Sequence, residues 1–279
     1  MGALSGRAAI VTGASRGLGL EIARAFVEAG ASVLLCARDA DTLEQARAEL
    51  GAEALVADVS RPEDAGRVVA AALDRLGDLH VLVNNAGVYG PIGPLDEVDW
   101  LEWTRAVEIN LYGSVLMARA ALPHLRARGY GKIVQVSGGG ATAPLPRFSA
   151  YAASKAAVVR FAETLAEETR GAGIDVNAIA PGALNTRLLD QVLEAGPERT
   201  GADFYERALR QQEEGGALPG RAAELAVFLA SAASDGITGR LLSALWDPWD
   251  KLPAHRDELS GSDVYTLRRI VPSERGLDW

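Results

Sequence analysis

The chain has 279 residues, of which 48% are hydrophobic and 23% are charged, and its formal net charge is −9. This length suits one large α/β domain, and the acidic balance argues against a nucleic-acid partner, because phosphate binding needs concentrated positive charge. No signal peptide precedes the first apolar run and no run approaches the length of a membrane span, so we expect a cytoplasmic protein with no membrane partner.

Short apolar runs alternate with longer segments of helical periodicity. The runs predict strands at residues 8–11, 33–36, 54–57, 81–83, 133–136, 174–179 and 241–245, and the first helical segments cover 20–29, 41–50 and 62–76. Alternating strands and helices indicate βαβ units, and continuous apolar strands indicate a parallel sheet covered on both faces. We therefore predict an α/β fold: a doubly wound, Rossmann-type parallel sheet of about seven strands with helices on both faces, in a single domain over residues 1–279.

The only cysteine, Cys36, closes the second apolar run. A single cysteine excludes an intrachain disulfide, and no cluster of metal-ligating residues accompanies it, so we predict no metal site. We interpret Cys36 as a buried strand residue, and a reactive thiol is the alternative.

A glycine-rich segment, Thr12-Gly13-Ala14-Ser15-Arg16-Gly17-Leu18-Gly19, joins the first strand to the first helix. Glycines at such a turn let the backbone approach a pyrophosphate, and the helix N-terminus offers free N–H groups and the positive end of its dipole. The place of the segment between a strand and a helix favours a dinucleotide site over a plain turn. The predicted cofactor-binding residues here are Gly13, Ser15, Arg16, Gly17, Leu18 and Gly19.

Tyr151 and Lys155 stand four residues apart on a predicted helix, so both lie on one face. A phenol with a pKa near ~10 is a poor base at neutral pH, and a neighbouring ammonium group lowers that pKa. Tyr151 can then donate a proton to a carbonyl oxygen or accept one from an alcohol. The pattern Y-x-x-x-K alone is also common on exposed helices.

Three motifs in a fixed order carry a family resemblance. They are TGxxxGxG at residues 12–19, Asn84-Asn85-Ala86-Gly87 after the fourth strand, and YxxxK at residues 151–155. Together they resemble the short-chain dehydrogenase/reductase family over about residues 5–245. The resemblance implies an NAD(P)-dependent oxidoreductase that acts on a carbonyl or a secondary alcohol.

The resemblance also implies roles for further residues. The cofactor positions fall on Asp58 and the adjoining Val59 at the adenine ring, on Asn85, Ala86 and Gly87 at the adenosine ribose, on Lys155 at the nicotinamide ribose, and on Pro181, Gly182 and Thr186 near the nicotinamide amide. Asn110 matches the asparagine that holds a water in the proton relay. A plain turn is the alternative for 181–182, and a structural helix asparagine is the alternative for Asn110.

The choice between NADP and NAD is made after the second strand. An acidic residue there binds the ribose 2′-hydroxyl, whereas arginine accommodates a 2′-phosphate. This chain has Ala37 at the acidic position, followed by Arg38, and Arg16 is a second cation within reach. Asp39 lies close by and keeps NAD open as the alternative. We favour NADP.

One catalytic position departs from the family. The family serine stands thirteen residues before the tyrosine, where this chain has Gly138, and Ser137 precedes it in Ser137-Gly138-Gly139-Gly140. The glycines could let the loop shift and bring Ser137 in, or their backbone N–H groups could take the oxyanion role. Thr142 or Ser149 could substitute, or carbonyl reduction could be impaired. We favour Ser137 as the catalytic residue beside Asn110, Tyr151 and Lys155.

Two regions break the alternating pattern. Residues 185–220 hold the family's substrate-loop position and carry one predicted helix, at about 204–212. The C-terminal extension, residues 246–279, contains Trp246, Trp249 and Trp279 and lies past the usual end of the family. It either helps to close a substrate pocket, in this subunit or a neighbouring one, or only covers the core or an oligomer face.

The predicted function is NAD(P)-dependent hydride transfer between nicotinamide and a small carbonyl or secondary alcohol substrate, with Tyr151 as the proton donor or acceptor. The alternatives are an epimerase or dehydratase with a recycled cofactor, and a nucleotide-sensing protein without turnover, which Gly138 favours. By family analogy we expect a homodimer or homotetramer.

Overall fold

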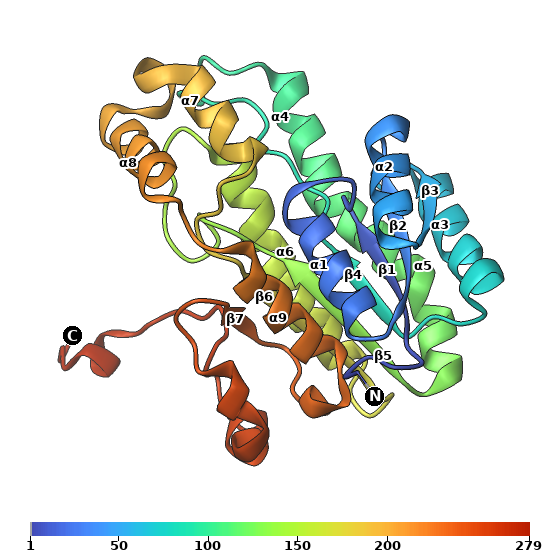
Figure 1. The fold of residues 1–279 in the computed structure, drawn as a ribbon. Coiled ribbons are helices and arrows are strands. Elements are labelled where there is room, and N and C mark those ends of the chain that lie inside the picture. The colour runs from blue at the N-terminus through green and yellow to red at the C-terminus, as the bar shows by residue number, and fades with distance from the viewer. Residues whose placement is uncertain (1) are drawn as a thin grey trace.

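A single parallel sheet forms the centre of the protein (Figure 1). The computed structural model describes residues 2–279. The sheet has the strand order β3-β2-β1-β4-β5-β6-β7. Its strands are β1 (Ala8–Thr12), β2 (Ser32–Ala37), β3 (Glu53–Val56), β4 (Val81–Asn84), β5 (Gly131–Val136), β6 (Ile174–Ala180) and β7 (Leu241–Ser243). All seven apolar runs therefore form strands, and the predicted doubly wound sheet is confirmed.

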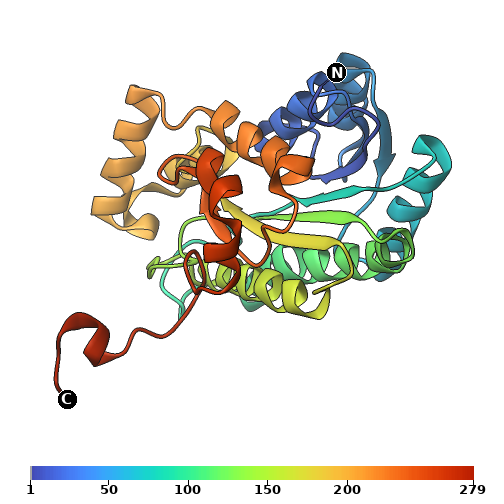
Figure 2. The ribbon, with the colours of Figure 1, turned by 90° about the horizontal axis from the view of Figure 1, so that it is seen from below.

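Helices cover both faces of the sheet, as Figure 2 shows. One face packs against α1 (Gly17–Glu28), α2 (Ala40–Leu50) and α9 (Pro219–Ala230). The other face packs against α3 (Pro62–Leu76), α5 (Gly113–Arg128) and α6 (Ser149–Glu168). Burial on both sides explains why most strand residues are apolar. Cys36 lies in β2 and is fully buried, and burial raises the pKa of its thiol to about 12, which fits the structural interpretation.

The order of the strands reverses between β1 and β4, and sheets of this kind bind ligands beyond the carboxyl ends of the strands at such a point. Thr12, the last residue of β1, connects the two strands at this point. Its Oγ1 accepts hydrogen bonds from the backbone N–H groups of Asn85 and Ala86 after β4, at 3.0 and 3.1 Å. The loop after β1 and the loop after β4 are thereby held together.

Two helices, rather than the one predicted, occupy the substrate-loop region. They are α7 (Arg187–Thr200) and α8 (Ala202–Glu214). The prediction missed α7 because Gly196 and Pro197 interrupt its sequence pattern, and the chain is kinked at Gly196, where φ is +73°. Figure 1 shows α7 and α8 at the same end of the molecule as α4 (Trp100–Val107).

The C-terminal extension packs along the sheet edge before it leaves the body of the protein. It carries the short helices Trp249–His255, Arg256–Ser260 and Pro272–Arg275. Trp249 is buried in the core, whereas Trp246 is 84% exposed and Trp279 is 86% exposed. In Figure 2 the last segment projects away from the sheet. The first half of the extension therefore has the covering role expected as one alternative.

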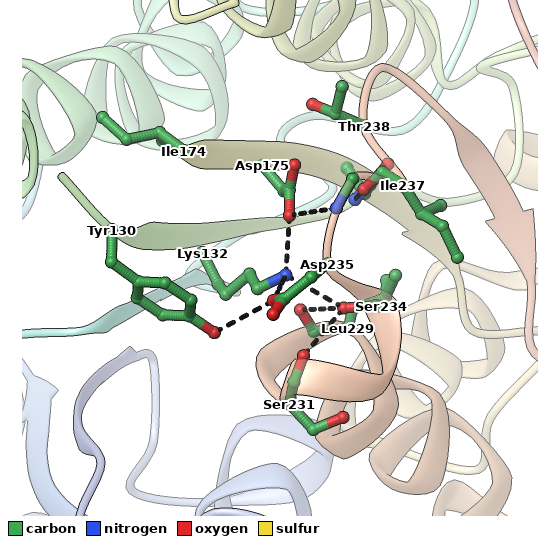
Figure 3. Close-up of polar contacts among 12 residues, drawn as sticks. Tyr130, Lys132, Ile174, Asp175, Leu229, Ser231, Ser234, Asp235, Ile237 and Thr238 are labelled. Atoms are coloured by element: carbon green, nitrogen blue, oxygen red, sulfur yellow. Dashed lines mark hydrogen bonds and ion pairs between the residues drawn. The ribbon is translucent and has the colours of Figure 1, made fainter. Parts of the chain in front are cut away.

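A buried ion pair lies at the amino ends of β5 and β6 (Figure 3). Lys132, the second residue of β5, places its Nζ 2.6 Å from Asp175 and 2.7 Å from Asp235. Ser234 accepts a further hydrogen bond at 3.3 Å. These contacts fasten the segment between α9 and β7 to β5 and β6. Within residues 2–279, no helix combines the length and the apolar character needed to cross a membrane.

Candidate active site

The glycine turn after β1 is shaped by close backbone contacts. Gly13 has φ at +64°, and a Cβ there would lie 2.8 Å from Ala86 Cα. A Cβ on Gly19 would lie 2.3 Å from the Gly13 carbonyl oxygen. The Asn85 amide donates to the carbonyls of Thr12 and Gly13 at 2.9 and 3.2 Å. Both glycines are thus required by the fold, and Asn85 serves to hold the turn.

The start of α1 is open to a ligand. Gly17 is exposed, has φ at +55°, and has only Thr186 within 4 Å of an added Cβ, with a shortest separation of 3.7 Å. The first turn of α1 contains no acidic residue and no side-chain cap, so its N–H groups remain available to an anion. These residues fit the phosphates of a dinucleotide. Leu18 is buried beneath the turn, so it can offer a cofactor only its backbone.

Arg16 and Arg38 are both exposed beside this turn. Neither forms an ion pair or side-chain hydrogen bond in the described part of the chain, residues 2–279. Asp39 is engaged elsewhere, because it caps α2 through bonds from the Thr42 N–H at 2.9 Å and the Thr42 hydroxyl at 2.6 Å. Those two bonds, chiefly that from the hydroxyl, lower the pKa of Asp39. Ala37, at the end of β2, adds no carboxylate.

Asp58 is held by a residue that the sequence did not indicate. Its Oδ2 lies 2.5 Å from Arg105 Nη2 on α4, and its Oδ1 accepts from the Ser60 hydroxyl at 2.6 Å. Burial works to raise the pKa of Asp58, but the bonds from Ser60 and Arg105 outweigh it and leave the pKa lowered. Val59 is buried against Gly113, where an added Cβ would lie 2.7 Å from Val59 Cγ2.

The structure brings Tyr151, Lys155 and Asn110 together at the start of α6. Lys155 Nζ donates to the Val136 carbonyl at 2.8 Å and lies 5.7 Å from the centre of the Tyr151 ring. Asn110 is fully buried, and its amide donates to the Val88 carbonyl and to Ser154 Oγ, each at 2.9 Å.

Asn110 stands in a π-helical turn, Glu108–Tyr112, between α4 and α5. Such turns are rare and are often found at functional sites. The N–H of Val88 donates to Asn110 Oδ1 at 2.8 Å, so the side chain is bonded to the loop after β4 in both directions. Asn110 therefore fixes the loop that follows Asn85, Ala86 and Gly87 against α6.

Burial shifts the pKa values of Tyr151 and Lys155 in opposite directions. It lowers the pKa of Lys155 to about 8 and raises the pKa of Tyr151 above its ordinary value. The expected lowering of the Tyr151 pKa by a neighbouring ammonium is thus wrong for the protein without ligands, because the loss of solvation, with a smaller effect of Tyr89, raises the pKa instead. Tyr151 consequently holds its proton at neutral pH.

Ser137 and Gly138 are placed differently from the sequence-based preference. Ser137 is buried, and its hydroxyl donates to the Lys155 carbonyl at 3.4 Å. Gly138 instead lies against the tyrosine, because a Cβ there would be 2.2 Å from Tyr151 Oη. In residues 2–279 no hydrogen bond joins Ser137 to Tyr151.

Aromatic and aliphatic side chains cover the outer side of Tyr151. The Tyr89 ring lies 4.7 Å from the Tyr151 ring and 5.1 Å from the Phe148 ring, and Phe204 of α8 packs on Phe148 at 4.8 Å. Arg147 has φ at +71° and donates to the Glu198 carbonyl at 2.6 Å, which ties this wall to the end of α7. No motif or periodic pattern indicated Tyr89 or Arg147.

A cavity of about 490 Å³ separates α4 from α7, and its lining includes Val88, Gly90, Arg105, Ile109 and Gln191. Two lining residues touch predicted site residues, because Arg105 pairs with Asp58 and the Val88 N–H donates to Asn110. Thr186 caps α7 through the N–H of Leu188 at 3.4 Å, and Gly182 has φ at +92°, with Leu245 Cδ1 2.5 Å from an added Cβ. Pro181 and Gly182 follow directly after β6, at the carboxyl edge of the sheet.

Comparison with known proteins agrees with this arrangement. A family model for short chain dehydrogenases matches residues 7–196. L-fucose dehydrogenase of Oryctolagus cuniculus is 37% identical over 232 residues, which are 82% of this chain and 81% of that protein.

Two solved structures have the same fold. NAD+-bound xylitol dehydrogenase matches with a TM-score of 0.79 and 26% identity, over 86% of this chain and 98% of that one. A variant of actinorhodin polyketide ketoreductase with NADPH matches with a TM-score of 0.79 and 31% identity, over 87% and 97%. The chain therefore belongs to the short-chain dehydrogenase/reductase family.

Proposed function

We propose that this chain interconverts a small secondary alcohol and its ketone with a nicotinamide dinucleotide, and that Tyr151 donates or accepts the proton. One observation carries the proposal: Tyr151 and Lys155 lie buried side by side where α6 meets the carboxyl end of β5, and the open start of α1 follows the carboxyl end of β1 in the same parallel sheet. When bound, the dinucleotide supplies or receives the hydride.

The protein's own groups divide the remaining work. A raised pKa keeps the proton on Tyr151 Oη, ready for donation to a carbonyl oxygen in the reductive direction. Lys155 anchors α6 to β5 and stands beside Gly87, where an added Cβ would lie 3.3 Å from its Nζ. Lys155 is thus placed to hold the nicotinamide ribose, and Asn110 keeps the adjoining loop in position.

We infer NADP(H) as the preferred cofactor. A 2′-phosphate needs nearby cations, and Arg16 and Arg38 are exposed without an ionic partner in residues 2–279. The competing 2′-hydroxyl contact needs a carboxylate after β2, where Ala37 has none and Asp39 uses its Oδ1 to cap α2 through Thr42. Solved relatives carry NAD+ in one case and NADPH in another, so the preference rests on these residues.

We further propose that residues 1–279 act as one catalytic unit, with 185–220 as the substrate loop. The side of Tyr151 that faces this loop is apolar, since Leu189, Val192 and Phe204 pack around Phe148 there. An apolar wall favours a substrate with a hydrophobic or cyclic body over an open-chain polyol.

The test measures oxidation of NADPH and of NADH with a panel of cyclic ketones, acyl ketones and keto-sugars. We expect turnover with a cyclic ketone, a lower KM for NADPH than for NADH, and a loss of kcat of about 100-fold or more in Tyr151→Phe. NADPH binding by Tyr151→Phe, measured by fluorescence titration, should match the wild type. Equal turnover in Tyr151→Phe and wild type would reject the assigned role of the tyrosine.

A further inference from the structure

We propose that the glycine turn 138–140 supplies a backbone hydrogen bond to the substrate oxygen, through the N–H of Gly139, beside the one from Tyr151. A carbonyl oxygen has two lone pairs, and the charge that develops on it during reduction is stabilised by a second fixed donor. This inference rests on the proposed oxidoreductase function, because it concerns the same substrate oxygen.

The turn lies directly against the catalytic hydroxyl. A Cβ on Gly138 would be 2.2 Å from Tyr151 Oη and 3.1 Å from Tyr151 Cζ, so the missing side chain leaves room for the hydroxyl itself. The nitrogen of Gly139 is two covalent bonds from the Cα of Gly138, or about 2.4 Å. Covalent geometry thus keeps the Gly139 nitrogen within a few ångströms of the space beside Tyr151 Oη that a Gly138 side chain would fill.

The donors of the turn are available. Across residues 2–279, the N–H groups of Gly139 and Gly140 donate no hydrogen bond to protein atoms. Gly139 is exposed, and an added Cβ there has no neighbour within 4 Å. The turn itself is closed by the Ala141 N–H, which donates to the Gly138 carbonyl at 3.3 Å, with Gly140 at φ +89°. A closed turn with free N–H groups is already ordered for an oxyanion.

In the described residues, no hydrogen bond joins a nearby side-chain hydroxyl to Tyr151 Oη. Ser137 is buried and donates to the Lys155 carbonyl at 3.4 Å. Ser149 Oγ accepts from Trp103 Nε1 at 3.1 Å. Thr142 is exposed and forms no side-chain hydrogen bond within the described residues that would direct its hydroxyl to Tyr151.

The chemical step balances without any proton leaving the turn. In reduction the carbonyl carbon gains a hydride, the carbon–oxygen π bond breaks, and the oxygen takes the proton from Tyr151 Oη. The Gly139 N–H donates a hydrogen bond throughout and keeps its proton. Oxidation reverses this step only after Tyr151 has lost its own proton to solvent, and the same donor then stabilises the alkoxide.

The experiment compares Gly139→Pro, which removes the N–H, with Gly139→Ala, which keeps it and places a Cβ in open space. For a ketone reduced by the wild type, we expect kcat of Gly139→Pro to fall at least about 100-fold below that of Gly139→Ala. Affinity for NADPH and the melting temperature should agree between the two variants. A common kcat would overturn the inference.

Further measurements separate misfolding of Gly139→Pro, and failure of the proposed oxidoreductase function, from failure of the inference about the turn. If Gly139→Pro does not fold, replacement of Gly139 by glycolic acid removes the N–H without a ring, and the same loss is expected. A loss in Ser137→Ala as large as that in Tyr151→Phe, with NADPH binding intact, would identify Ser137 as the donor and reject the turn. Absence of turnover in the wild type with every ketone would count against the proposed function itself.

Discussion

Lys155 Nζ donates to the carbonyl oxygen of Val136 at 2.8 Å, which joins α6 to the end of β5 directly behind Tyr151. The bond places a cation where no solvent can stabilise its charge, and burial lowers the pKa of Lys155 to about 8 from an ordinary 10.5. The catalytic site therefore contains a group whose burial opposes folding as long as it is charged.

This burial predicts a specific pH dependence of stability. Below pH 8 the lysine is charged in both states and its desolvation cost is fully present, whereas between pH 8 and 10.5 only the unfolded chain keeps the proton. The unfolded state then binds more protons, so stability rises with pH across that window. At about 1.4 kcal/mol per pKa unit, the wild type should gain about 3 kcal/mol relative to Lys155→Met. Urea unfolding of both proteins from pH 7.5 to 10.5 checks this, and parallel curves would contradict it.

The preference for NADP can be tested at the two free arginines. Arg16→Ala and Arg38→Ala should each raise KM for NADPH about tenfold, because each removes one charge-assisted contact to the 2′-phosphate, and should leave KM for NADH nearly unchanged. Arg170→Ala is the matched control, since Arg170 is exposed and pairs with Glu167 at the far end of α6. Steady-state kinetics with both cofactors decides the matter. An equal rise of KM for NADH would mean that the arginines do not distinguish the 2′-phosphate of NADPH from the 2′-hydroxyl of NADH.

Much of the fold could be predicted because strands buried on both faces are largely apolar, as in residues 8–11 of β1 and 81–83 of β4. The motif glycines were also predictable, since Gly13 and Gly19 stand where any Cβ would collide with backbone. Helix α7 was missed because Gly196 and Pro197 hide its periodicity, although the chain only kinks there.

The partners within the site could not be predicted in the same way. Arg105 meets Asp58 across 47 residues, and Tyr89 packs on Tyr151 through a tertiary contact that no local pattern encodes. Ser137 and Gly138 illustrate a second limit. Neighbouring residues at the end of an extended strand face opposite sides, so a one-residue difference decides which of them reaches Tyr151.

The buried pair at the base of β5 makes a prediction about stability alone. Lys132→Met should destabilise the protein by about 3–5 kcal/mol, because Asp175 is left buried without its cation. Asp235→Asn should cost less than about 1 kcal/mol, since Asp235 is half exposed. Both variants should keep the kcat of the wild type, because Lys132 lies at the amino end of β5, whereas Tyr151 lies near the carboxyl end of that strand. Equal destabilisation by the two substitutions would show that Asp175 does not depend on Lys132.

The C-terminal extension divides into two parts with different expected roles. Arg240 donates to the carbonyls of Ser262 and Val264 at 2.9 and 2.7 Å, and the Leu267 N–H donates to Glu163 at 2.6 Å. In the described residues beyond 267, side-chain hydrogen bonds and ion pairs connect only residues of the extension itself, such as Arg268 and Glu274 at 2.5 Å.

Truncation after residue 245 should therefore prevent folding or lower stability by several kcal/mol. It removes three buried side chains, Trp249, Leu252 and Leu259, each worth about 1.5–3 kcal/mol, and leaves Arg240 without its acceptors. Truncation after residue 267 should change the melting temperature little and leave substrate selectivity as it is. Thermal unfolding and kinetics on the ketone panel test both proteins. A folded 1–267 enzyme with altered selectivity would instead place residues 268–279 at a substrate pocket. If the same truncated chain also failed to form oligomers, that pocket would belong to a neighbouring subunit.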